Sequence, residues 1–420
     1  MASKENPTST TDLSKSYLGK RRHSESEDTL TGESSDNNCP PRSFTVKRTS
    51  SESSEIQSQT SSNASHIGID HIPKETRDWT EETIFNNLQI KDMLSPSPLD
   101  VFNNGYVDCF LKNHAKIRDY MLRVDKDHQH RSKHDCYEFA LNKAFDVDCS
   151  VLSDVTISKA LQLTEEFKKP FEDSCFAKWL FVNEKHESKD MRNICKNIYP
   201  RLQQFCEQLL VMVECTHTSQ NSDNLTEAMY RELFVTFLRI FGVTVLAVPN
   251  LCAYHLTIGD RIVTSIPDAV VCSYVRNGEE VNKKVIAVVE VKKNYTRHSN
   301  LETVRQTRNS ERKTSVIKHI DSGLKGQHAG EMLAVIPSSV FDSNGIYGII
   351  VQGTMITFVS LATSQEYCNN LNEGKMKNCH ATIKYSNAVN MLSTKGRQEL
   401  VSTFLGMSTL LDCMSQEIMN

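Results

Sequence analysis

The segment Val285–Lys293 limits the possible folds of this chain more than any other part of it. Successive residues of a β-strand point to opposite faces, and here both faces begin with valine, isoleucine and alanine. Up to Lys292, charge appears on only one face and only at the end, as Glu290 and Lys292. A strand that is apolar on both faces is typical of the middle of a sheet covered on both sides. The segment therefore predicts a central strand with a charged end.

The residues around this strand predict a mixed α/β domain with a central sheet flanked by helices. A helix is expected over Leu225–Phe241, where apolar residues recur on one side of a helical wheel. A second helix is expected around the apolar run that follows Glu331. Strands are expected at Val243–Val248, Ala253–Ile258, Arg261–Tyr274 and Ile346–Leu361, with turns at Gly259-Asp260, Asn277-Gly278 and Gln352-Gly353.

The rest of the chain divides into three further regions. Residues 1–75 form a Ser/Thr-rich tail, which we expect to be disordered because the first 65 residues contain 17 serines and 8 threonines and almost no aliphatic pattern. Residues 76–215 show helical periodicity, for example at Tyr106–Val124, Phe167–Phe181 and Ile194–Val213. The α/β domain is expected over residues 225–365 and a helical extension over 366–420.

Composition and short motifs indicate an intracellular protein. The N-terminus has no apolar signal sequence, and no apolar run is long enough to span a membrane. The thirteen cysteines form no CxxC pair, which favours a reducing compartment. Lys20-Arg21-Arg22-His23 lies in the polar tail and is typical of a nuclear import signal, although a chance basic cluster would look the same. We therefore expect a nuclear location.

A second expected strand also contains a charged residue. Asp268 interrupts its apolar run from Ile262 to Tyr274. A buried carboxylate without a partner costs several kcal/mol, so Asp268 and Glu290 need partners. A three-residue turn at 277–279 would pair Asp268 with Val288 and bring Glu290 onto the same face, whereas a two-residue turn would separate the two acids. We therefore expect an odd-length connection between the two strands.

Two carboxylates, a lysine and a backbone carbonyl form a set of ligands suited to Mg²⁺ or Mn²⁺. Asp268, Glu290 and the carbonyl of Val291 would bind the ion, and Lys292 would orient a water molecule or neutralise charge on a phosphate. This combination predicts hydrolysis of phosphodiesters. The alternative is a surface salt bridge between Glu290 and Lys292 or Lys293, which leaves Asp268 unexplained.

Pro267-Asp268 and Glu290-Val291-Lys292, with 21 residues between them, resemble the PD-(D/E)XK nuclease signature. The resemblance covers roughly residues 225–365 and implies a restriction-endonuclease-like core. It also implies that an acid on the preceding helix helps to hold the metal. Glu227 is the first choice because it falls within the apolar arc of the helix, and Glu232 is the second. Gln327 fits the glutamine that the family often carries on its later helix.

A basic segment follows the central strand. Residues 292–325 contain nine lysines and arginines against three acids, and Lys293, Arg297, Arg305 and Arg308 are candidate phosphate contacts. The alternative is a solvated polar segment. A net charge of −4 excludes a uniformly basic protein but not a local basic face. We therefore expect a nucleic-acid partner, DNA rather than RNA, and a homodimer is an open possibility.

Two other functions and one other metal site stay open. The chain is either an active nuclease, a catalytically inactive nucleic-acid-binding module derived from a mobile element, or an interaction protein based on the helical region. Cleavage that needs metal separates the first from the second, and the third predicts that Asp268 and Glu290 lie far apart. His128, His130, His134 and Cys136 are irregularly spaced for a zinc site, so we expect a solvated loop there.

Overall fold

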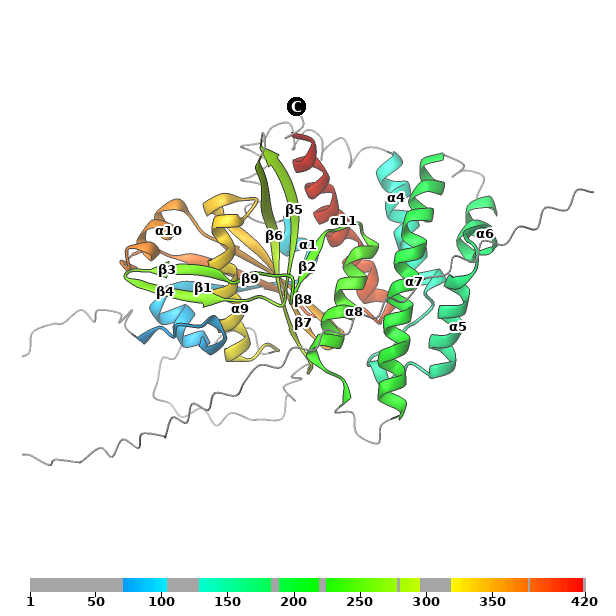
Figure 1. Cartoon of the computed structure of the whole chain (residues 1–420), viewed down its shortest axis with the longest axis horizontal. Helices are drawn as coiled ribbons and strands as arrows, with labels where there is room; N and C mark the ends of the chain where they lie inside the picture. Colours follow the sequence, from blue (N-terminus) through cyan, green and yellow to red (C-terminus); the bar gives the residue numbers. More distant parts are fainter. Residues whose placement is uncertain are drawn as a thin grey trace, which may run out of the picture. The chain divides into compact units, whose positions relative to one another are not determined.

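The computed structural model describes residues 71–103, 128–182, 189–218, 224–277, 280–294, 319–376 and 378–417. A large mixed sheet with the strand order β1-β9-β8-β7-β6-β5-β2 lies at its centre, with β10 paired to β8 (Figure 1). The pairs β6–β7 and β1–β9 are parallel and the other pairs are antiparallel. The strands are β1 (Ile90–Ser95), β2 (Val245–Ala247), β5 (Ala269–Asn277), β6 (Glu280–Lys292), β7 (Gly345–Gln352), β8 (Met355–Ala362), β9 (Ala381–Ser386) and β10 (Val389–Asn390).

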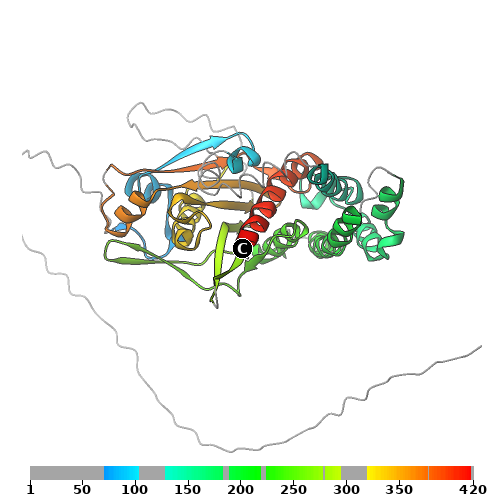
Figure 2. The ribbon, with the colours of Figure 1, turned by 90° about the horizontal axis from the view of Figure 1, so that it is seen from above.

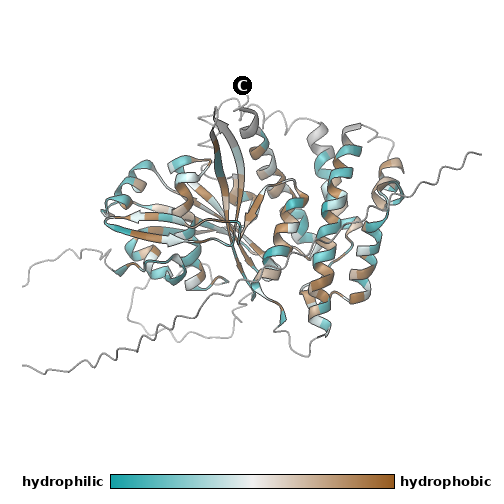
Figure 3. Cartoon of the chain, in the orientation of Figure 1, coloured by the Kyte–Doolittle hydropathy of each residue, from teal (hydrophilic) through white to brown (hydrophobic). Residues whose placement is uncertain are grey.

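The centre of the sheet is apolar, as the sequence of β6 predicts. All eight residues of β7 are buried, and the part of β6 that pairs with β7 is buried up to Val291. Hydrophobic residues follow these central strands in Figure 3. The expected mixed α/β architecture with helices against a central sheet is confirmed.

Helices cover both faces of the sheet (Figure 2). On one face, α7, α8 and α11 share a hydrophobic core with Ala287, Val289 and Val291 of β6. On the other face, α9 packs with Val288 of β6. The helices are α1 (Pro98–Asn103), α4 (His128–Phe139), α5 (Ile157–Lys168), α6 (Cys175–Val182), α7 (Lys189–Thr218), α8 (Glu227–Ile240), α9 (Ser322–Val335), α10 (Gln365–Asn372) and α11 (Thr394–Glu417).

Two regions expected to be helical contain strands, and one stretch expected to be a loop is a helix. The helical pattern of residues 76–215 and of the C-terminal extension hid β1 and β9, which pair with each other at one end of the sheet. Strand β1 lacks alternation and β9 alternates over only six residues, and such short strands are hard to recognise in sequence because pairing rather than local preference selects them. The histidine-rich stretch expected to be a loop is α4, which places Cys136 in the core.

The expected strand from Arg261 to Tyr274 is two strands. Its first part, β4 (Arg261–Ser265), pairs with β3 (Tyr254–Ile258) in a separate two-stranded sheet, and its second part is β5. Pro267 lies at the break, where it removes one backbone hydrogen-bond donor from the run. Asp268 therefore lies immediately before β5 rather than inside a strand.

The expected odd-length connection between β5 and β6 is wrong. Asn277 pairs with Glu280, which leaves two residues between the strands, and these lie outside the described residues. A β-bulge restores the face relationship, because Cys272 pairs with Val285 whereas Val271 pairs with Ala287. Ile286 is thus the extra residue, and beyond it Ala269 pairs with Val289. Asp268 and Glu290 are the next residues along the two strands and so come opposite each other.

Several expectations fall outside the described residues. These are the polar tail up to residue 70 with Lys20-Arg21-Arg22-His23, the whole helix expected at Tyr106–Val124, and the segment with Arg297, Arg305 and Arg308. In the part of the chain that the structure describes, no helix is long and apolar enough to cross a bilayer.

Candidate functional site

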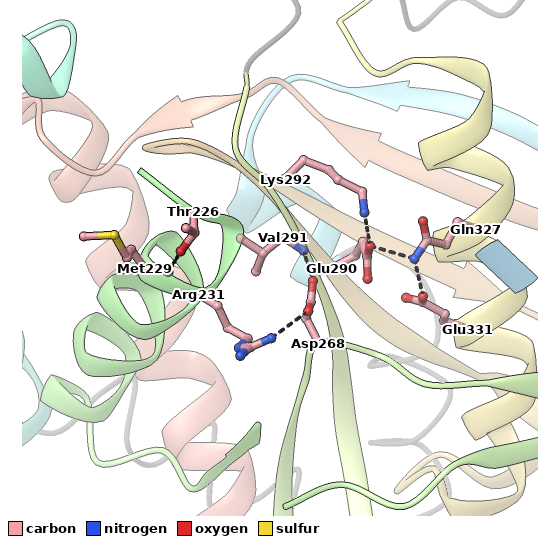
Figure 4. Close-up of polar contacts among 9 residues, drawn as sticks. All are labelled: Thr226, Met229, Arg231, Asp268, Glu290, Val291, Lys292, Gln327 and Glu331. Carbon is pink, nitrogen blue, oxygen red and sulfur yellow. Dashed lines mark hydrogen bonds and ion pairs between the residues drawn. The ribbon is translucent and has the colours of Figure 1, made fainter. Parts of the chain in front are cut away.

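The charged end of β6 forms the middle of the candidate site (Figure 4). The side chain of Glu290 is only 2% exposed, and its Oε1 lies 2.8 Å from Nζ of Lys292. Lys292 follows two residues later on the same face of the strand and is partly exposed. The strand therefore carries its acid inward and its lysine toward the surface.

Asp268 completes the acid pair from the chain just before β5. Its Oδ2 accepts a hydrogen bond of 2.9 Å from the backbone N–H of Val291, which fixes the carboxylate against the end of β6. Its Oδ1 accepts a hydrogen bond of 3.1 Å from Nη1 of Arg231 on α8. The structure thus brings Asp268, Glu290 and Lys292 together, as the sequence predicts.

Arg231 was not among the residues expected at the site. It lies four residues after Glu227, so both side chains project from the same side of α8. A cation at this spacing from an expected acid is the signal that would have identified it. Thr226 caps the N-terminus of the helix, because its side chain accepts a hydrogen bond from the N–H of Met229.

Glu227, expected to face the core, is exposed in the structure. It is the first residue of α8, where the helix has only started to pack and where its charge favours the helix N-terminus. Its charge nevertheless contributes to raising the pKa of Lys292. Glu232, the second choice, is also exposed and forms an ion pair of 3.6 Å with Arg239.

Helix α9 contributes an amide and a third acid. Nε2 of Gln327 donates to Oε1 of Glu290 at 2.7 Å and to Oε1 of Glu331 at 2.9 Å (Figure 4). Glu331 is buried, and its Oε2 has no hydrogen-bond partner among the described residues. Gln327 was expected to contact nucleic acid, whereas its amide here links two carboxyl groups. Glu331 was not expected, because its sequence neighbours gave no sign that it is buried.

Burial and mutual repulsion change the proton affinities of these groups. Burial, together with the charge of Asp268, raises the pKa of Glu290 to about 7, although Lys292 opposes this shift. Burial and the charge of Glu290 raise the pKa of Glu331 well above its usual value. Burial alone would lower the pKa of Lys292, but the charges of Glu290, Glu227 and Asp268 outweigh it and raise this pKa.

Asp268 and Glu290 fit a hard divalent cation. The charge of Asp268 is close enough to raise the pKa of Glu290, and a cation held by both carboxylates would relieve this repulsion. The Val291 carbonyl as a third ligand stays a prediction. His134, Asp135 and Glu138 on α4 form another group of potential ligand atoms within 4.8 Å of one another. None of these three is buried, and His134 Nε2 already contacts Ser402 Oγ at 3.0 Å, so they form no convincing site.

Lys293 follows the site at the end of β6 and is partly exposed. It is the first of the candidate phosphate contacts and the one that lies in the described part of the basic segment.

The chain as a whole matches no protein-family model, no curated protein and no solved structure significantly. Any function assigned to the chain therefore rests on the chemistry of these residues.

Proposed function

We propose that this chain is a metal-dependent nuclease that hydrolyses phosphodiester bonds of nucleic acid, DNA rather than RNA. The observation that carries the proposal is the convergence of Asp268, Glu290 and Lys292 at the end of a central strand. A purely structural salt bridge would need only Glu290 and Lys292. It would not require a second acid whose charge raises the pKa of Glu290.

Each residue has a separate task in this proposal. Asp268 and Glu290, with the Val291 carbonyl, would hold Mg²⁺ or Mn²⁺, which when bound lowers the pKa of a water molecule and neutralises phosphate charge. Lys292, kept protonated by its acidic neighbours, orients the attacking water and stabilises charge on the phosphate. Arg231 balances Asp268 and offers its guanidinium group to a phosphate oxygen.

The arrangement of elements supports the same function. The helix α8, the antiparallel pair β5–β6, the helix α9 and the parallel strand β7 follow one another in the order that the PD-(D/E)XK resemblance implies. The basic segment after β6 would bind the phosphate backbone without sequence preference. A nuclear location through the basic cluster of the tail, and a homodimer that cuts both strands, belong to the same proposal.

One observation favours a second function, nucleic-acid binding without cleavage. Asp268 is balanced by Arg231 and the Val291 N–H, and Glu290 is balanced by Lys292 and Gln327. Each of these two carboxylates thus contacts one cationic side chain and one neutral N–H donor without a metal. In an inactive module the same residues would simply stabilise the end of the sheet, and binding would not depend on metal.

The test is cleavage of labelled single- and double-stranded DNA and RNA with Mg²⁺ or Mn²⁺, comparing the intact chain with Asp268→Ala and Lys292→Ala. We expect each substitution to lower the rate about 100-fold or more. The matched control is Lys284→Ala, which removes the other lysine of β6 that has an acidic partner, Asp342 at 3.3 Å. This control should keep its activity.

The results separate the functions clearly. Cleavage that survives Asp268→Ala would show that the activity comes from another site or from a contaminant. Metal-independent binding without cleavage, unchanged in both variants, would support the inactive module. Absence of both binding and cleavage would contradict both functions and direct attention to the helical region.

A further inference from the structure

A cavity of about 320 Å³ lies beside the carboxylates, on the α9 side. Three segments line it: residues 75–77, which overlap the 3₁₀ turn η2 (Thr76–Asp78), Thr264 of β4 with Ile266 just after that strand, and Gln327 and Glu331 of α9. Pockets for small ligands start at about 300 Å³, so the volume suffices for one flat ring system with room for water.

The cavity and the acid pair share one wall. The same Gln327 Nε2 that donates to Glu290 also donates to Glu331, so a single amide stands between the cavity and the carboxylates. Ile266 lines the cavity and lies two residues before Asp268. A group inside the cavity is therefore next to whatever lies at Asp268 and Glu290.

The polar lining selects the kind of group that fits. Arg77 lies 2.7 Å from Glu75 and 4.0 Å from Asp78, so its charge is already balanced. Glu331 adds a buried oxygen that has no partner among the described residues. A phosphate would meet these acids without an unbalanced cation among the lining residues, which disfavours it. A neutral group with N–H donors along one edge suits the lining.

An apolar contact completes the lining. Ile266 is 56% exposed, a large exposure for an isoleucine beside a polar cavity. A nucleobase has a flat apolar face and an edge of hydrogen-bonding groups, so Ile266 and the pair Gln327 and Glu331 match its two features. An aromatic peptide side chain such as tryptophan also has a flat face, but its edge carries a single N–H donor for the two groups at Gln327 and Glu331.

We propose that this cavity receives one unstacked nucleobase of the strand whose phosphate lies at Asp268 and Glu290. The proposal rests on the proposed function and narrows its substrate to nucleic acid with an unpaired nucleotide at the cut, either single-stranded or locally opened. Ile266 contacts the face of the base. Glu331 and Gln327 contact its edge.

The experiment compares two oligomers of equal length and charge in EDTA, so that binding is measured without cleavage. One is single-stranded DNA and the other is the same strand built entirely from abasic tetrahydrofuran phosphates. The intact chain should bind the base-bearing strand about tenfold more tightly, the effect expected of one base contact. Ile266→Trp fills the cavity and should abolish most of this ratio.

Ile262→Trp is the matched control, because Ile262 lies on β4 four residues before Ile266, is 64% exposed and does not line the cavity. It should keep the ratio. Both positions are exposed, so neither variant should disturb folding, which thermal melting verifies. A ratio that stays the same in Ile266→Trp, or a chain that binds neither oligomer, would overturn the proposal.

The same experiment distinguishes the cavity from the nuclease. If the chain cleaves and Ile266→Trp leaves the affinity ratio of base-bearing to abasic strand unchanged, the nuclease proposal would be supported and the base pocket would be contradicted. A base-dependent ratio that is lost in Ile266→Trp, in a chain that never cleaves with any metal, would keep the pocket and contradict the proposed catalysis.

Discussion

Two helices of equal length, α8 and α9, pack on opposite faces of the same central strands, and their buried residues differ in kind. Each has 14 residues. Apart from Thr236, the buried residues of α8 are aliphatic or aromatic. Helix α9 instead buries Lys325, His328 and Glu331, three groups that are costly to remove from water.

The glycines of α9 add to this contrast. A Cβ atom on Gly326 would lie 2.3 Å from the backbone nitrogen of Thr80, and one on Gly330 would lie 2.7 Å from the ring of Trp79. These glycines let the segment around η2 approach the helix closely, and that segment supplies one wall of the cavity. Helix α8 thus buries apolar residues and contributes Arg231 from its less buried side, whereas α9 gives up apolar contact and presents Gln327 and the buried Glu331 beside Glu290.

The largest expected effect concerns the packing helix. Phe237 of α8 is fully buried and contacts the rings of Phe205, Phe241 and Phe404, with centroids 5.5 to 6.0 Å apart. We expect Phe237→Ala to lower the free energy of unfolding by about 3–5 kcal/mol, measured by urea denaturation. Phe181→Ala on α6, where the ring is 54% exposed, should cost less than about 1 kcal/mol. A small loss at Phe237 would mean that the α8 core is loosely packed.

The second prediction tests the ionisable core of α9. His328 is fully buried with Nε2 3.3 Å from the carbonyl of Val288, and burial lowers its pKa to about 4. The unfolded chain binds this proton near pH 6.5, so the free energy of unfolding should fall as the pH falls from about 6.5 to 4, by about 3 kcal/mol in total. Below pH 4 both states are protonated and the effect levels off.

The measurement is the difference in unfolding free energy between the intact chain and His328→Gln across this pH range. Glutamine can still donate to Val288 but does not titrate, so the difference should change with pH. The control His255→Gln replaces an exposed histidine of β3 and should show no such change. A pH-independent difference for His328→Gln would show that water reaches the α9 core.

The same contrast explains how far the sequence could predict the structure. Apolar periodicity identified α8, and the two apolar faces of β6 with charge at one end located Glu290 and Lys292, because packing imposes regular spacing on residues that only pack. The bulge at Ile286 was not predictable, since it depends on how two strands pair rather than on either strand alone. The expected loop length was therefore wrong, although the predicted association of Asp268 and Glu290 was correct.

Residues outside this regular pattern were harder to find. Arg231 and Glu331 lie on helices where a charged residue is normally read as exposed, and only the packing shows that one binds Asp268 and the other is buried. The strands β1 and β9 escaped because they pair across nearly 300 residues of sequence. Sequence patterns thus identified the packing elements, whereas long-range contacts decide the polar details of the site.

The smallest expected effect goes in the opposite direction, because it removes a cost. Burial and the charge of Glu290 raise the pKa of Glu331, so the folded chain keeps this proton to a higher pH than the unfolded chain, in which the carboxyl ionises above about pH 4.3. Its presence therefore lowers the free energy of unfolding as the pH rises, and each pKa unit of elevation corresponds to about 1.4 kcal/mol. Glu331→Gln should be more stable than the intact chain at pH 8 in EDTA by about 1 kcal/mol or more. At pH 4 the two should be equal.

The same substitution should reduce the preference for base-bearing over abasic strands, so that stability and binding change in opposite directions. This outcome would show that α9 keeps the buried carboxyl group of Glu331 for function, at a cost in stability. Glu232→Gln on α8 is the matched control, since that acid is exposed, and it should change stability by less than about 0.5 kcal/mol at either pH. If Glu331→Gln were instead less stable at pH 8, Glu331 would have a structural role and the distinction between the two helices would fail.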